Sequence, residues 1–134
     1  GVIAEVQIYD TSSETIFDFN VWLRKVGVSQ ASLSMSISKK DMENMVDDLN
    51  KGTRFDGVST ISEPYELQGF VLSYFPTENE VTVNINGIFG DITVVINSLV
   101  FKHILTAVIE LHTRGLIEGN AYIFEDGKMQ FVSE

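Results

Sequence analysis

The chain holds only two histidines, the side chains best suited to proton transfer near neutral pH. His103 and His112 fall in one segment with helical periodicity and are nine residues apart, so they lie on opposite sides of that helix and cannot share a metal ion. His103 and Glu110 do share a face, because a spacing of seven residues returns a side chain to nearly the same angle. Such a pair could exchange a proton but supplies no nucleophile. We therefore favour a solvated helix face and keep an acid/base site as the alternative.

The sequence lacks the other motifs that indicate an enzyme or a bound cofactor. It contains no cysteine, and it has no calcium-binding loop, no glycine-rich phosphate-binding turn and no Gly-x-Ser-x-Gly nucleophile elbow. Asp47 and Asp48 are adjacent on a predicted helix, so their carboxylates diverge by about 100° and cannot share a proton. We predict a protein that is not an enzyme and that has neither a cofactor nor a metal.

The charge balance favours a basic partner. Nine Lys and Arg residues against nineteen Asp and Glu residues give a formal net charge of −10. A charge of that sign disfavours nucleic acid and anionic lipid as direct ligands, and it attracts basic proteins. The alternative, in which the excess charge only keeps the protein soluble, stays open.

No Lys or Arg occurs between Arg54 and Lys102, and a group of acidic residues lies in that stretch. Such a stretch can steer a basic protein, although folding can still bring a base close. Tyr74 joins the group as a candidate aromatic anchor, although a second buried face is the favoured place for Trp22, Tyr74 and Tyr122. The predicted partner-binding residues are Glu63, Glu66, Tyr74, Glu78, Glu80 and Asp91.

The acidic residues of the first predicted helix have bases within one turn. Lys40 can pair with Glu43, and Asp47 with Lys51. We therefore expect Glu43 and Asp47 to contribute less to a partner surface.

The elements that position these residues begin with three strands. Alternation of apolar and polar residues predicts strands over residues 2–9, 15–26 and 31–37, and their short connections favour antiparallel pairing. A helix follows, with Ser38 as its N-cap and Gly52 as its C-cap. Its predicted core stripe is Met42, Met45, Val46 and Leu49.

The second half alternates strands with one further helix. Residues 53–64 are predicted as a loop, with a short strand at 58–62 as an option. A helix capped by Asn97 or Ser98 runs to about Thr113, with a core stripe of Phe101, Ile104, Leu105, Val108 and Leu111. The predicted strands are 66–75, 80–89, 91–96, 121–124 and 129–132, with turns at 76–79 and at Asp126-Gly127. The sequence thus predicts one α+β domain over residues 1–134, built as an antiparallel sheet or a small sandwich with two helices.

The element order, the Ser38–Leu49 pattern and the segment Ile61–Leu67 resemble the WapI-type immunity proteins of bacterial polymorphic and contact-dependent toxin systems. The likeness covers about residues 2–113. It implies a cytoplasmic protein without a catalytic site that binds and blocks a basic toxin domain, commonly a nuclease. The alternative is a small ligand-binding or enzyme domain with a pocket between the sheet and the second helix, lined by His103 and Glu110.

The start of the chain leaves two interpretations open: the protein begins in the cytoplasm, or a segment was removed from it. Residues 1–5 lack the basic region of a signal peptide, and no stretch is apolar enough for a membrane span. We expect a cytoplasmic protein with no membrane segment.

Overall fold

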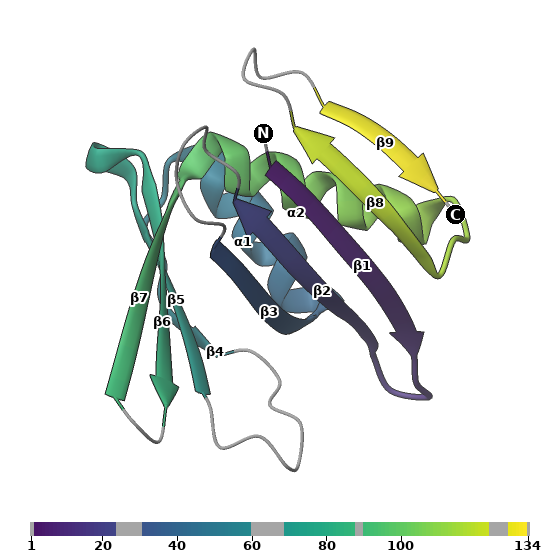
Figure 1. Cartoon of the computed structure of the whole chain (residues 1–134), viewed down its shortest axis with the longest axis horizontal. Helices are drawn as coiled ribbons and strands as arrows, with labels where there is room; N and C mark the ends of the chain where they lie inside the picture. The colour runs from purple at the N-terminus through teal and green to yellow at the C-terminus, as the bar shows by residue number, and fades with distance from the viewer. Residues whose placement is uncertain (1, 24–30, 60–68, 88–89, 124–128, 134) are drawn as a thin grey trace.

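Two antiparallel sheets and two α-helices make up the part of the chain that the structure describes (Figure 1). The computed structural model describes residues 2–23, 31–59, 69–87, 90–123 and 129–133. The strands are β1 (Val2–Asp10), β2 (Thr15–Leu23), β3 (Ala31–Ser38), β4 (Asp56–Ser59), β5 (Gly69–Phe75), β6 (Glu80–Gly87), β7 (Gly90–Asn97), β8 (Glu118–Ile123) and β9 (Met129–Ser133). The helices are α1 (Lys39–Lys51) and α2 (Ser98–Thr113), and a 3-10 turn, η1 (Pro76–Glu78), joins β5 to β6. The predicted α+β class is confirmed.

The larger sheet brings distant parts of the chain together. Its strand order is β3-β2-β1-β8-β9, so β1 pairs with β2 on one side and with β8, from the end of the chain, on the other. The smaller sheet is the meander β4-β5-β6-β7. Since α2 follows β7 and packs on strands of both sheets, the helices bridge the two sheets. The sequence predicts either a single sheet or a small sandwich, and the structure has two sheets joined through helices.

The larger sheet buries one face and leaves the other open. Along β1, Ala4 and Val6 are buried whereas Glu5 and Gln7 are exposed, as the alternation predicts. Figure 1 shows α1 and α2 behind this sheet and no helix in front of it. No helix in the described part of the chain covers its outer face.

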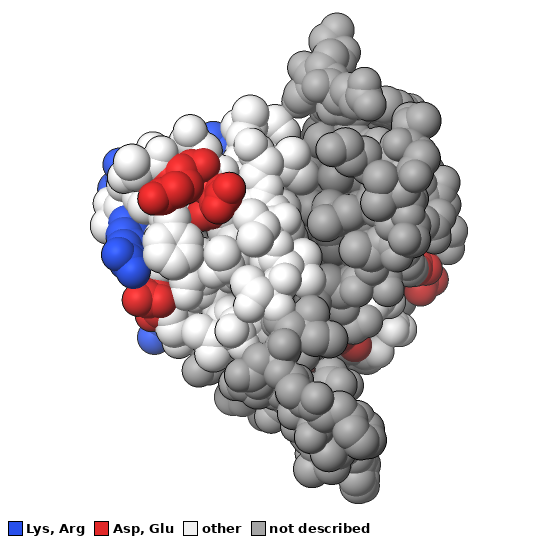
Figure 2. Space-filling view, turned by 60° about the vertical axis from the view of Figure 1, so that its left-hand side comes forward, with Lys and Arg blue, Asp and Glu red and all other residues white. Residues whose placement is uncertain are grey.

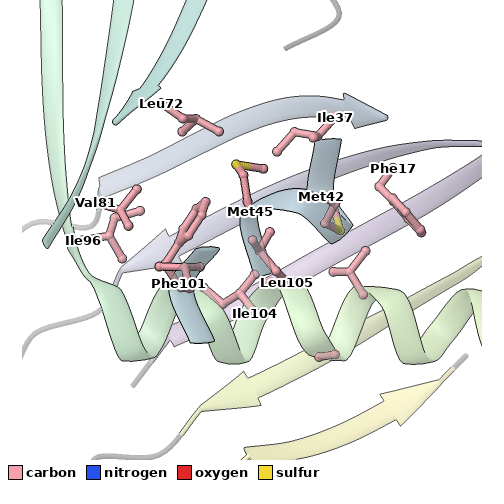
Figure 3. Close-up of a cluster of buried hydrophobic side chains, with 14 of the residues drawn as sticks. Phe17, Ile37, Met42, Met45, Leu72, Val81, Ile96, Phe101, Ile104 and Leu105 are labelled. Atoms are coloured by element: carbon pink, nitrogen blue, oxygen red, sulfur yellow. The ribbon is translucent and has the colours of Figure 1, made fainter. Parts of the chain in front are cut away.

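One hydrophobic core draws on both helices and both sheets. Figure 3 shows Phe101 of α2 pointing toward Met45 of α1, beside Val81 and Ile96 of the smaller sheet. The predicted stripe of α2 is fully buried, and Ala107 joins it. On α1, Met42, Met45 and Leu49 are buried and Val46 is partly buried. No helix in the described residues combines the length and hydrophobicity that a membrane span requires.

The helix boundaries follow the predicted capping residues. The Ser38 hydroxyl accepts a hydrogen bond from the Asp41 N–H at 3.2 Å, and Gly52 takes a left-handed conformation with φ 67°. Of the two candidate caps of α2, Asn97 is the one used. Local capping chemistry therefore sets both starts.

Some strand boundaries differ from the prediction. β4 begins at Asp56 instead of Val58, because a register shift at Gly57, where φ is 74°, interrupts the alternation. β8 begins at Glu118 instead of Ala121, because pairing with β1 overrides the weak strand propensity of Gly119 and Asn120. The predicted strand residues 24–26, 66–68 and 88–89 and the turn at Asp126-Gly127 lie outside the described residues.

Candidate interaction surface

The β5–β6 hairpin carries two of the predicted partner-binding acids. Pro76 begins η1, where its fixed φ suits the first position, and Asn79 closes the turn with a φ of 55°. Glu78 is exposed on this turn, and Glu80 is partly buried at the start of β6. Neither carboxylate forms an ion pair with any residue that the structure describes.

The other predicted acids do not join this hairpin in the described residues. Asp91 pairs with Asn86, whereas Glu80 pairs with Asn97 at the opposite end of the same two strands. At ~3.3 Å per residue, these positions are about 20 Å apart. Glu63 and Glu66 lie outside the described residues. The hairpin therefore offers Glu78 and Glu80 alone.

Tyr74 is a core residue. Its side chain is only 5% exposed, and its ring centroid lies 5.6 Å from that of Phe55. An aromatic anchor must project from the surface to enter a partner. The expectation that Tyr74 is such an anchor is therefore corrected in favour of the buried alternative, because β5 turns this side chain toward the core.

Folding brings basic groups toward the hairpin. The Arg54 guanidinium lies 4.9 Å from the ring centroid of Phe75 and 3.4 Å from a carboxylate oxygen of Asp56. Lys102 lines the same pocket as Asn79, the residue between Glu78 and Glu80. Figure 2 shows acidic and basic side chains interspersed on the left of this view. The stretch without bases in sequence is thus not without bases in space.

Glu43 and Asp47 of α1 are both paired, largely as predicted. The Lys51 ammonium donates to Asp47 at 2.9 Å, and this hydrogen bond raises the pKa of Lys51. Glu43 pairs with Lys39 at 3.8 Å instead of with the predicted Lys40, because Lys39 precedes it by four residues. Both carboxylates already have a cation nearby.

A further acidic surface, which the sequence analysis did not single out, lies on the open face of the larger sheet. Gln7 on β1 pairs with Asp18 on one side and with Glu118 on the other, and Glu5 lies two residues away on the same face. Glu5 and Glu118 are exposed, and Asp18 is partly buried and accepts a hydrogen bond from the Ser36 hydroxyl at 3.0 Å. We call Glu5, Asp18 and Glu118 the sheet acids.

Within the described residues, none of the sheet acids forms an ion pair. None of the nine Lys and Arg residues lies in any strand that the structure describes. Asp18 and Glu118 are two strands apart, about 10 Å. The alternation along the strand predicts that Glu5 lies on an outer face. That Asp18 and Glu118 lie on the same face follows from the pairing of β1 with β8, which no local pattern reveals.

The two histidines lie apart, as predicted. His112 Nε2 lies 3.3 Å from an Asp10 carboxylate oxygen, and its ring meets Phe17 edge-on at 5.8 Å. The Thr15 hydroxyl and then His112 hold the pKa of Asp10 below its usual value. Within the described residues, no group of three His, Asp or Glu side chains could hold a metal ion. The contact between Asp10 and His112 joins the end of β1 to the end of α2.

His103 and Glu110 do not line a described pocket. Glu110 is exposed, and His103 is partly buried with its Nδ1 unpartnered among the described residues. A pocket of about 410 Å³ does lie at the N-terminal end of α2, on the side of Lys102. Neither His103 nor Glu110 lines this pocket.

The chain was also compared with known proteins. No family model, curated protein or solved structure matches it significantly.

Proposed function

We propose that this protein is a non-catalytic immunity protein that binds and blocks a basic toxin domain, in the first instance a nuclease. The observation that carries the proposal is the open face of the larger sheet, with its sheet acids and no Lys or Arg in any of its strands. The resemblance to WapI-type immunity proteins supports the same class of partner. The cytoplasm is the proposed site of action, with no direct contact to nucleic acid or membrane.

Electrostatics favours the sheet acids over the hairpin as the centre of the interface. Unneutralised carboxylates gain most when a basic surface arrives, and a surface of one sign raises the rate of encounter. Arg54 and Lys102 approach the hairpin, whereas the larger sheet has no comparable base in its strands. Glu78 and Glu80 therefore form a second, weaker contact surface in the proposal.

The proposed mode of inhibition is occupation of the substrate channel. A nuclease channel must be basic because it holds a polyanion. The sheet acids are fixed by neighbouring strands, so they present carboxylates at a set spacing of about 5–10 Å. Carboxylates held in this way can take the places of phosphate groups without being cleaved.

The proposal predicts that a toxin domain is encoded beside this protein's gene, and inhibition of that domain is the test. We expect the two proteins to copurify and the nuclease activity to fall to background at an equimolar ratio. Glu5→Lys/Glu118→Lys serves as the matched loss-of-binding variant, and Glu43→Lys as the control outside the surface. Full nuclease activity in the presence of excess protein, or turnover of a small substrate that depends on His103 or Glu110, would overturn the proposal.

A further inference from the structure

The pocket at the start of α2 is formed by three elements that meet at one corner of the molecule. Leu49 comes from the end of α1, Tyr74 and Asn79 from the β5–β6 hairpin, and Asn97, Ser98, Leu99 and Lys102 from the start of α2. Its volume of about 410 Å³ lies within the usual range for small-molecule sites, roughly 300–1,000 Å³. The pocket is large enough for a small organic molecule.

Lys102 is the charged residue of this pocket. Its side chain is partly buried, and it forms no ion pair with any residue in the described part of the chain. In a protein with a net charge of −10, a partly buried ammonium group without a carboxylate partner is unexpected. Its position favours an anionic ligand.

Tyr74 supplies a second polar group that has no partner. The residue is only 5% exposed, yet its hydroxyl forms no hydrogen bond with a described residue. The completely buried side-chain atoms without a hydrogen-bond partner are, in the described part, Asn84 Oδ1 and His103 Nδ1. The Tyr74 hydroxyl is not one of them, so it is accessible to solvent. Since Tyr74 lines the pocket, we infer that its hydroxyl opens into it and can donate to a ligand.

The backbone at the start of α2 is already satisfied. The Ser98 N–H donates to the Asn79 carbonyl at 2.8 Å, and the N–H groups of Leu99 and Val100 donate to Asn97 Oδ1 at 2.9 and 3.3 Å. An anion therefore cannot rely on free helix N–H groups here. Recognition falls to the side chains, chiefly the Lys102 ammonium and the Tyr74 hydroxyl.

We propose that this pocket binds a small organic carboxylate with an apolar body. One cation suits a singly charged group, and the carboxylate can accept from both Lys102 and Tyr74 in charge-assisted hydrogen bonds. The apolar body lies against Leu49 and Leu99, and Leu99 is 50% exposed at the rim. The proposal does not depend on toxin binding, because the groups that bind the carboxylate, Lys102 and Tyr74, belong to neither the sheet acids nor the hairpin acids Glu78 and Glu80.

Benzoate and benzamide are the matched probes, because they share a shape and differ in charge. In an NMR titration of the full chain, benzoate should shift the amide signals of Ser98, Leu99 and Lys102 with a saturable, millimolar dissociation constant. Benzamide should bind at least about tenfold more weakly.

Variants of the polar groups complete the test. Lys102→Met should weaken benzoate binding by about tenfold, and Tyr74→Phe, which keeps the buried ring, by roughly threefold or more. Lys51→Met is the control, because it removes an equal charge outside the pocket. Equal binding of benzamide and benzoate, unchanged affinity in Lys102→Met, or no saturable shift at the pocket amides would overturn the proposal.

Discussion

Two neighbouring side chains stabilise the charged form of the Asp10 carboxylate. Its carboxylate accepts from the Thr15 hydroxyl at 2.7 Å and lies 3.3 Å from His112 Nε2. Thr15, as the largest cause, holds the pKa of Asp10 below 3.8, and His112 adds to this effect. A lowered folded-state pKa contributes stability that is present above the unfolded pKa and is lost as the pH falls through the folded pKa.

Replacing Thr15 tests this assignment. Thr15→Val removes the hydroxyl donor and keeps the β-branched shape, so the pKa of Asp10 should rise toward 3.8. A carboxyl carbon NMR titration measures it. Thr113→Val is the control, because the Thr113 hydroxyl donates to the Ile109 carbonyl in the wild type and not to Asp10. In this variant the pKa of Asp10 should not change. An unaltered Asp10 pKa in Thr15→Val would contradict the assignment.

At the scale of elements, the N-cap hydrogen bond of Ser38 stabilises the start of α1. Ser38→Ala removes the acceptor for the Asp41 N–H, and we expect a loss of about 1 kcal/mol in the free energy of unfolding. Ser38→Thr keeps a hydroxyl at the same position and should lose less. Urea unfolding measures both variants. If Ser38→Ala is as stable as the wild type, the cap does not stabilise the helix.

Elements were predictable where their signals are local. The ends of α1 follow from Ser38 and Gly52, which act on their immediate neighbours, so the helix could be placed before the fold was known. The sequence predicts a start for β4 that is two residues too far along the chain, because Gly57 interrupts the alternation. It also predicts too late a start for β8, because the first residues of β8 form a strand only through pairing with β1. A signal that lies in the partner strand leaves no pattern in the strand itself.

The candidate surface shows the same limit. The exposure of Glu78 follows from its place in a turn, which the sequence indicates. Tyr74 could not be assigned to the core or the surface, because β5 carries apolar residues on both faces. Glu118 approaches Asp18 only because both strands pair with β1, more than 100 residues away from Glu118 in the chain.

At the scale of the whole molecule, the charge distribution separates into two kinds of surface. In the described residues, helices and loops carry Lys and Arg together with acids, whereas the only charged residues of the strands are acids. The strand acids are Glu5, Asp10, Asp18, Asp56, Glu80, Asp91 and Glu118. A basic partner is therefore expected to approach the open face of the larger sheet.

Channel occupation can be tested by competition. If the sheet acids occupy the channel, this protein should displace a fluorescent oligonucleotide from a catalytically inactive form of the toxin domain, because both ligands need the same basic groups. Fluorescence anisotropy reports the displacement. A ternary complex of oligonucleotide, toxin domain and this protein would instead place the interface outside the channel.

Association kinetics with the toxin domain test the central claim most directly. Rate constants would be measured at low and high salt for the wild type, Glu5→Lys/Glu118→Lys, Glu78→Lys/Glu80→Lys and Glu43→Lys. We expect the sheet pair to slow association by about tenfold or more at low salt, the hairpin pair to slow it less, and Glu43→Lys to change little. High salt should bring the rates together. The opposite ranking, or equal rates for the wild type and the sheet pair at low salt, would contradict an interface on the open face of the larger sheet.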